Sequence, residues 1–239
     1  MKKRLTILLM LTLTVILSSS ARVAHLLPRP KQVETLRMGA FMLQRNVQLH
    51  DPTHCLMLQS FLADHGCAVT ANAKAVVRVE LSASMDATAD YPLYGYDDEA
   101  YRLRVSPDSI TITAVTPVGV VRAVATLQQL AEGYDAKPMV EAVSITDYPA
   151  FKLRGYMHDT GRSYISVYEP KKEIRLLPHF KVNTFHWHLT ENQAWRFEVK
   201  AFPQLTADTT MTRQAGRYYT QPQCSELEAY ARQYGTVVI

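Results

Sequence analysis

The sequence predicts an α/β protein with two parts, a small α/β domain followed by the opening strands of a parallel sheet or barrel. Between residues 22 and 147, apolar residues recur with periods of both two and 3.6. Beyond residue 148, strand and helix patterns alternate at the spacing of βαβ units. The 239 residues are 47% hydrophobic and 20% charged, which is typical of a packed chain rather than a disordered one.

Residues 1–21 predict a secretory signal peptide. Lys2, Lys3 and Arg4 precede an apolar run from Leu5 to Leu17, and small residues follow as far as Ala21. The run is shorter than the roughly 20 residues that span a bilayer, so we expect export without a stable membrane anchor. Loss of this segment removes three cations and lowers the formal net charge from +4 to +1. No Lys/Arg stripe remains that would predict a nucleic-acid partner.

Within the domain over residues 22–148, "CLMLQSFLADHG" predicts a helix from Cys55 to Gly66. Because this helix would hold Cys55 and Cys67 about 18 Å apart, we expect no disulfide between them. "AVVRVEL" predicts a strand with three apolar side chains on one face: Val77, Val79 and Leu81. "AYRLRV" and "SITITAV" predict a hairpin, and "GVVRAVATLQQLAEG" predicts a helix with an apolar core stripe that ends before Gly133.

Residues 149–239 predict the βαβ segment. The expected strands are "KLRGYMHD", "VNTFHWHLT" and "TVVI", and the expected helices open at Pro170 and at Ser225. An interior proline costs a helix about 3 kcal/mol, so Pro178 predicts a kink or an end near Leu177. We expect a long polar loop after Thr190.

Two histidines in the second predicted strand suggest one alternative function. His186 and His188 point to the same face of an extended strand, so they are candidates for metal ligands, with His158 or Asp159 completing the site. A metal hydrolase is therefore one hypothesis. Because no further ligand follows at a recognised metal spacing, we expect hydrogen-bonded structural histidines and no metal.

Other polar residues are weaker candidates for a sugar site. The planar guanidinium of Arg154 suits vicinal hydroxyls, and Glu191 follows a strand end, where barrel active sites collect. Two interpretations fit Trp195: its flat apolar face binds a sugar ring, or its side chain packs against the rest of the fold. Asp98 and Glu99 are the adjacent acidic pair of the chain, and we expect them to form a solvated turn.

The segments "LRGYMHDTGRSY" and "FKVNTFHWHLTENQAWRFEVKAFPQLT" resemble the start of the catalytic barrel of glycoside hydrolase family 20, the β-N-acetylhexosaminidases. "LLPRPKQVE" and "YRLRVSPDSITITA" are similar to the α/β domain that precedes this barrel in the family. The resemblance implies that residues 149–239 form the first three strands of an incomplete (β/α)8 TIM barrel. Asn192 and Ala194 depart from the family, in which a second acid and a glycine are usual.

The resemblance also implies an activity. Members are retaining exo-hydrolases that remove terminal β-linked N-acetylglucosamine or N-acetylgalactosamine from glycans by substrate-assisted catalysis, without a cofactor or metal. By resemblance Arg154 binds the sugar hydroxyls, Glu191 supports a histidine of the third strand and, through it, the catalytic Glu, and Asp159, with Arg162, shapes the barrel mouth. Trp195 belongs to a loop that helps to build the sugar pocket.

The resemblance places the catalytic Asp-Glu pair downstream of Ile239, so we expect this chain by itself to be inactive. A non-catalytic remnant or sugar-binding module that keeps Arg154 and Trp195 is the second hypothesis, beside the metal hydrolase. The signal peptide predicts a periplasmic or extracellular product.

Overall fold

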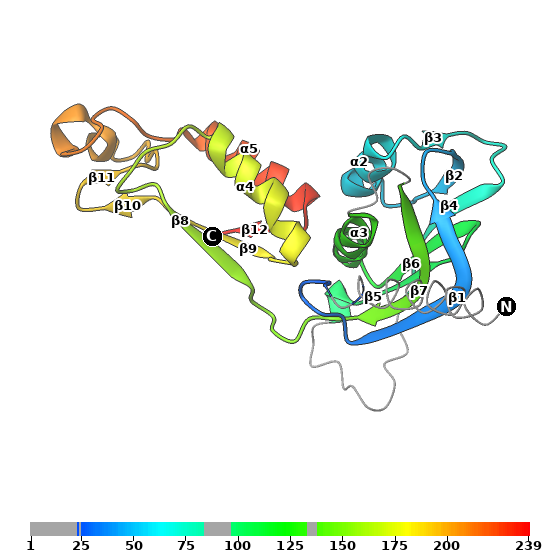
Figure 1. Ribbon diagram of the computed structural model, residues 1–239. Coiled ribbons are helices and arrows are strands. Elements are labelled where there is room, and N and C mark those ends of the chain that lie inside the picture. The colour runs from blue at the N-terminus through cyan, green and yellow to red at the C-terminus, as the bar shows by residue number, and fades with distance from the viewer. Residues whose placement is uncertain (1–22, 24, 84–96, 133–137) are drawn as a thin grey trace, which may run out of the picture. The chain divides into compact units, whose positions relative to one another are not determined.

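The computed structural model describes residues 23, 25–83, 97–132 and 138–239 (Figure 1). The chain divides between Ala150 and Phe151 into two compact units, here called the N-terminal unit and the C-terminal unit. The predicted signal peptide, residues 1–21, lies outside the described residues. None of the described helices has both the length and the apolar character that crossing a membrane requires.

The N-terminal unit is built on one mixed seven-stranded sheet with the strand order β1-β7-β5-β6-β4-β2-β3. β1, β7, β5 and β6 pair antiparallel, whereas β6, β4, β2 and β3 pair parallel. Helices α2 (Leu56–Asp64) and α3 (Pro117–Ala131) lie on the same side of this sheet (Figure 1). The strands are β1 (Gln32–Met42), β2 (Asn46–His50), β3 (Ala68–Val69), β4 (Ala75–Leu81), β5 (Tyr101–Val105), β6 (Ser109–Ala114) and β7 (Met139–Asp147).

The predicted hairpin and core helix are confirmed. β5 and β6 pair antiparallel, and the Ser106 amide closes their turn with a hydrogen bond of 2.8 Å to the Ser109 carbonyl. The apolar stripe of α3 is fully buried, and Val77 and Val79 of β4 are buried as well, but Leu81 at the end of that strand is 47% exposed. The alternation of apolar residues therefore identifies which face of the strand is buried, but not the residue at which that face becomes exposed to solvent.

The prediction of a solvated acidic turn is wrong for Glu99. This residue ends the 3-10 helix η1 (Asp97–Glu99) and is buried, where its carboxylate accepts a 2.6 Å hydrogen bond from Nε of Arg122 on α3. A buried charge is stable only when it is paired, and Arg122 is buried too. The two residues are far apart in the sequence, so no local pattern identifies the pair.

The C-terminal unit contains a three-stranded parallel sheet with the order β12-β9-β8, which confirms the βαβαβ prediction. The strands are β8 (Gly155–Asp159), β9 (Thr184–His188) and β12 (Val237–Val238), and the connecting helices are α4 (Tyr168–Leu176) and α5 (Gln221–Gln233). Both helices lie on one side of the sheet (Figure 1). Phe185 and Trp187 of β9 are buried, whereas His186 between them is exposed, as strand alternation predicts.

Several boundaries differ from the prediction. α4 begins at Tyr168 instead of Pro170, and it ends at Leu176 before the 3-10 helix η2 (Leu177–Phe180), as Pro178 predicts. α5 begins at Gln221 instead of Ser225, because Thr220 and Gln223 form a capping box that satisfies the first backbone amides. The strand expected to reach Thr190 ends at His188.

The segment after His188 is more ordered than the polar loop that we expected. It contains a short antiparallel hairpin of β10 (Thr190–Glu191) and β11 (Ala194–Trp195), followed by 3-10 helices η3 (Pro203–Thr206) and η4 (Asp208–Thr210). The hairpin places Glu191 directly beyond the end of β9.

Candidate functional site

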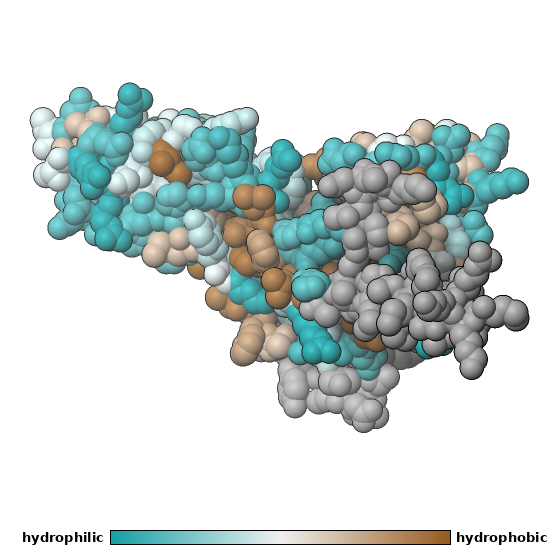
Figure 2. Space-filling view, viewed as in Figure 1, coloured by the Kyte–Doolittle hydropathy of each residue, from teal (hydrophilic) through white to brown (hydrophobic). Residues whose placement is uncertain are grey.

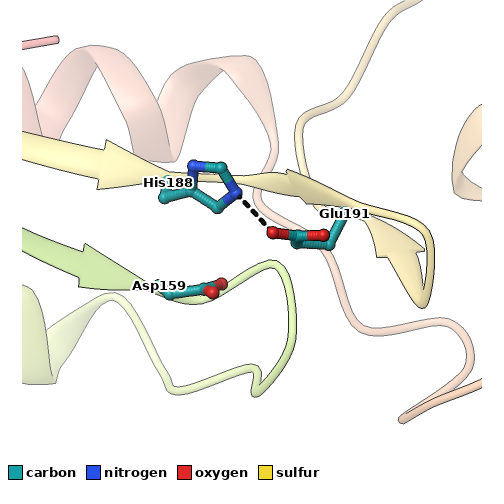
Figure 3. Close-up of side chains that lie close together, drawn as sticks. All are labelled: Asp159, His188 and Glu191. Carbon is teal, nitrogen blue, oxygen red and sulfur yellow. Dashed lines mark hydrogen bonds and ion pairs between the residues drawn. The ribbon is translucent and has the colours of Figure 1, made fainter.

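Three polar side chains meet at the carboxyl ends of β8 and β9 (Figure 3). Asp159 is the last residue of β8 and His188 the last of β9, and the parallel register pairs them. Glu191 comes from β10 just beyond. Paired residues of a parallel sheet point to the same face, so the register explains why Asp159 and His188 are neighbours.

The three side chains form a compact cluster of one imidazole and two carboxyls. Nε2 of His188 lies 3.0 Å from Oε1 of Glu191 and forms a hydrogen bond with it. One oxygen or nitrogen of each residue lies within 4.8 Å of those of the other two. The side chains of His188 and Glu191 are each 32% exposed, so the cluster is accessible from outside the unit.

Arg162 holds the Asp159 carboxylate from the other side. Its backbone N–H donates a 3.0 Å hydrogen bond to Oδ1, and its Nε pairs with Oδ2. Burial acts to raise the pKa of Asp159, but the hydrogen bonds and charge of Arg162 outweigh burial and hold that pKa below its usual value. Asp159 therefore stays ionised at neutral pH.

The metal hypothesis named two of the three clustered residues, His188 and Asp159, but not Glu191. The imidazoles of His186 and His188 lie on one face with ring centroids 5.8 Å apart, but His186 is not part of the cluster. One imidazole and two carboxylates form a donor set that a divalent ion accepts. Arg162 already supplies a cation to Asp159, so the residues present fit an ion-paired cluster better than a metal site.

Arg154 lies away from this cluster. It precedes β8 rather than beginning it, and five residues of extended chain, about 16 Å, separate it from Asp159. Its Nε donates to the carbonyl of Lys181 and its Nη1 to that of Phe151, both at 2.7 Å. The structure therefore brings Asp159 and Glu191 together but leaves Arg154 at the opposite end of the strand.

Trp195 lies on β11, where its backbone pairs with Thr190, and its side chain is 36% exposed. The indole is thus neither a fully buried packing plug nor a free loop residue. This position leaves part of the ring available to a ligand.

One buried residue close to the site in the sequence was not singled out. Arg196 follows Trp195 in the Q-x-W-R motif, and its side chain is fully buried. Its guanidinium donates to the carbonyls of Gly161, Arg213, Gln214 and Arg217. Nothing in the local sequence separates a buried arginine from the more common solvated one, so the motif itself was the available signal.

Tyr219 packs beside this arginine and was also missed. Its ring lies 4.4 Å from that of Trp187 and 4.9 Å from that of Tyr164, between ring centroids, and its hydroxyl donates to the carbonyl of Ile165 at 2.6 Å. Burial raises the pKa of Tyr219 to about 12, so the phenol remains protonated as a donor.

Comparison with known families matches both units. The model of the glycosyl hydrolase family 20 catalytic domain matches residues 151–239, and the model of domain 2 of the same family matches residues 24–148. The chain belongs to glycosyl hydrolase family 20.

Individual proteins are similar over most of the chain. A beta-hexosaminidase of Vibrio furnissii is 38% identical over 157 residues, which cover 60% of this chain and 26% of that protein. The crystal structure of the exo β-N-acetylglucosaminidase of Vibrio harveyi with N-acetylglucosamine has a TM-score of 0.69 at 30% identity and covers 89% of this chain and 35% of that one. The β-N-acetylhexosaminidase of Streptomyces coelicolor A3(2) has a TM-score of 0.74 at 26% identity, with coverage of 91% and 46%.

The chain spans about a quarter of the length of the curated relatives that it matches, 26% of one and 24% of another. The matched part of family 20 contains domain 2 and the segment of the catalytic domain that carries the Asp159, His188 and Glu191 cluster.

Proposed function

We propose that this chain is the N-terminal part of an exported exo-β-N-acetylhexosaminidase, which removes terminal β-linked N-acetylglucosamine or N-acetylgalactosamine from glycans. The observation that carries the proposal is the order of the two family 20 models, domain 2 followed by the catalytic domain, over nearly all described residues. The similar proteins of Vibrio furnissii and Vibrio harveyi, a beta-hexosaminidase and an exo β-N-acetylglucosaminidase, agree with this activity.

In this proposal the reaction retains configuration and uses the acetamide of the substrate as the nucleophile, while an Asp-Glu pair downstream of Ile239 orients the acetamide and protonates the leaving oxygen. Glu191 supports the catalytic Glu through a further histidine. Its carboxylate is held by His188 and remains one-third exposed at a strand end, which leaves it available to that histidine.

The proposed site binds substrate without a metal or cofactor. By the family resemblance Arg154 would donate to the ring hydroxyls, although in this structure it lies at the amino end of β8, where the carbonyls of Lys181 and Phe151 accept hydrogen bonds from its Nε and Nη1. Trp195 would offer its exposed part to the sugar ring.

Release of a chromogenic aglycone from a β-N-acetylglucosaminide tests the activity. The 239-residue product is compared with a product that continues into the downstream coding sequence, and a β-glucoside serves as the control substrate. We expect turnover of the acetamido substrate by the longer product alone. Turnover by the 239-residue product would contradict the downstream position of the catalytic pair, and no turnover by either would contradict the activity.

Export is tested separately by fractionation of the producing cell. We expect the mature protein outside the cytoplasm, with an N-terminus at Arg22 when it is sequenced. A cytoplasmic product that retains Lys2 and Lys3 would contradict the proposed export.

A further inference from the structure

Arg196 is a fully buried charge whose acceptors among the described residues are all uncharged. Nε donates to the Gly161 carbonyl at 3.2 Å, and Nη1 and Nη2 donate to the carbonyls of Gln214, Arg217 and Arg213 at 2.9, 2.7 and 2.7 Å. Nη1 also lies 3.5 Å from the sulfur of Met211. A buried guanidinium is costly unless its donors are satisfied, so this shell of carbonyls must stay in place around it.

The carbonyl shell joins two segments that are far apart in the sequence. Gly161 lies in the turn directly after β8, whereas the other three carbonyls belong to residues 213–217, which follow η4. The Arg196 backbone is fixed as well, because its N–H donates to the Leu189 carbonyl at 2.9 Å and its carbonyl accepts from Tyr219 at 2.7 Å. The side chain therefore ties the turn at Gly161 to the 213–217 segment.

Gly161 is in turn packed against the candidate site. Its N–H donates to the His188 carbonyl at 3.0 Å. A Cβ placed at this residue would lie 3.2 Å from Cγ of Glu191 and 3.3 Å from Oδ1 of Asp159. The Gly161 turn therefore lies close enough to both carboxyl side chains that its position bears on theirs.

We propose that Arg196 is a positioning residue, which acts through the Gly161 turn to hold Glu191 and Asp159 in their places beside His188. The hydrogen bonds of the Arg196 side chain reach backbone carbonyls and the sulfur of Met211, and not the three side chains of the cluster. Its role is to fix the backbone on which their geometry depends. The kinetic part of the test rests on the proposed function, whereas the spectroscopic part does not.

The spectroscopic test observes His188 directly. The 239-residue chain is labelled with 15N-histidine, and the His188 ring resonances are assigned with His188→Gln. We expect Arg196→Ala to shift the His188 ring resonances. Free guanidinium at about 5–50 mM, the concentration range in which weak ligands bind, should restore them. Arg217→Ala is the matched control, because it removes an exposed guanidinium of the same segment and keeps the carbonyl that accepts from Arg196.

The kinetic test uses the longer product that carries the proposed activity. A displacement of about 1 Å in a supporting group lowers turnover up to roughly 100-fold, so we expect kcat to fall about 10- to 100-fold in Arg196→Ala while KM stays within about twofold. Arg196→Lys should recover part of kcat, since its ammonium reaches some of the carbonyls, and guanidinium should recover part of it in Arg196→Ala. Arg217→Ala should leave kcat unchanged.

Gly161→Ala provides an independent variant if Arg196→Ala does not fold. It retains Arg196 and places a Cβ 3.2 Å from Cγ of Glu191 and 3.3 Å from Oδ1 of Asp159, so these side chains must shift to make room. We therefore expect a shift of the His188 resonances with no response to guanidinium. Unchanged His188 resonances in both Arg196→Ala and Gly161→Ala would overturn the inference, as would a loss in Arg196→Ala that appears in KM and not in kcat. If the wild-type longer product has no activity, the proposed function fails and the His188 resonances alone decide the role of Arg196.

Discussion

The two units of the chain bury their sheets differently. In the N-terminal unit, the inward residues of β5 and β6 are all less than 2% exposed beneath α3. In the C-terminal unit, Phe185 and Trp187 of β9 are buried. Met157, Val237 and Ile239 of the same unit are between 51% and 61% exposed. Figure 2 shows apolar side chains gathered on the surface around β8 and β9.

Secondary structure and sheet pairing therefore form in both units without equal burial. The C-terminal unit forms its three parallel strands with one covered face, so it removes less apolar surface from water per residue than the N-terminal unit does. Since hydrophobic burial is the dominant favourable term in folding, we expect the C-terminal unit to be the less stable of the two. Both tryptophans, Trp187 and Trp195, lie in the C-terminal unit, so their fluorescence reports on that unit alone.

The largest expected effect comes from truncating a matched pair of phenylalanines. Phe41 of β1 and Phe185 of β9 are both 0% exposed, and each change to alanine costs about 3–5 kcal/mol. We expect Phe185→Ala to abolish the cooperative urea transition followed by tryptophan fluorescence, because the loss is large relative to the free energy of unfolding expected for the C-terminal unit. Phe41→Ala should lower only the midpoint followed by far-UV circular dichroism. Equal losses in both units would contradict the comparison.

A buried ion pair gives the next effect, in the N-terminal unit. Arg122→Met leaves the Glu99 carboxylate buried without its 2.6 Å partner, so we expect a loss of about 3–5 kcal/mol in the free energy of unfolding. Replacing both residues, Arg122→Met with Glu99→Leu, should recover most of the loss. Arg78→Met breaks an exposed pair with Glu80 and should cost less than about 1 kcal/mol. Urea unfolding measured by circular dichroism distinguishes these outcomes.

Helix caps allow a smaller, matched comparison between the units. Thr116 caps α3 and Thr220 caps α5, each by accepting a hydrogen bond from a backbone amide. Thr→Ala at either position should cost about 1 kcal/mol, whereas Thr→Ser keeps the hydroxyl and should cost little. Only Thr220→Ala should move the tryptophan fluorescence midpoint. A shift of that midpoint in Thr116→Ala would show that the units unfold together.

The smallest expected effect is a pH dependence in the C-terminal unit. The pKa of Asp159 is lower in the folded state than in the unfolded one, so its stabilisation is fully present above the unfolded value of about 3.9. That stabilisation is lost as pH falls through the lower folded value. Asp159→Asn should therefore lower the urea midpoint at pH 6 and converge on the wild type in stronger acid. Glu169→Gln, at an exposed carboxylate of the same unit, is the control, and a constant difference at all pH values would contradict the assignment.

Much of the fold could be predicted from local patterns. The hairpin of β5 and β6, the buried stripe of α3 and the alternation of β8, α4, β9, α5 and β12 follow from apolar periods, and Pro178 marks the end of α4. α5 begins four residues before the expected Ser225, because the capping box of Thr220 and Gln223 satisfies the first backbone amides there, whereas the apolar pattern alone marks only the later turns. The sequence motifs also identified family 20.

The family, the order of the strands and helices along the chain, and the residue types at the candidate site therefore follow from the sequence alone. The side-chain partnerships depend on the three-dimensional fold: Glu191 with His188, Glu99 with Arg122, and Arg196 with its carbonyls. The two kinds of information differ in their range along the chain. Periodicity and caps act over a few residues, whereas burying a charge requires partners that the fold brings together from distant segments.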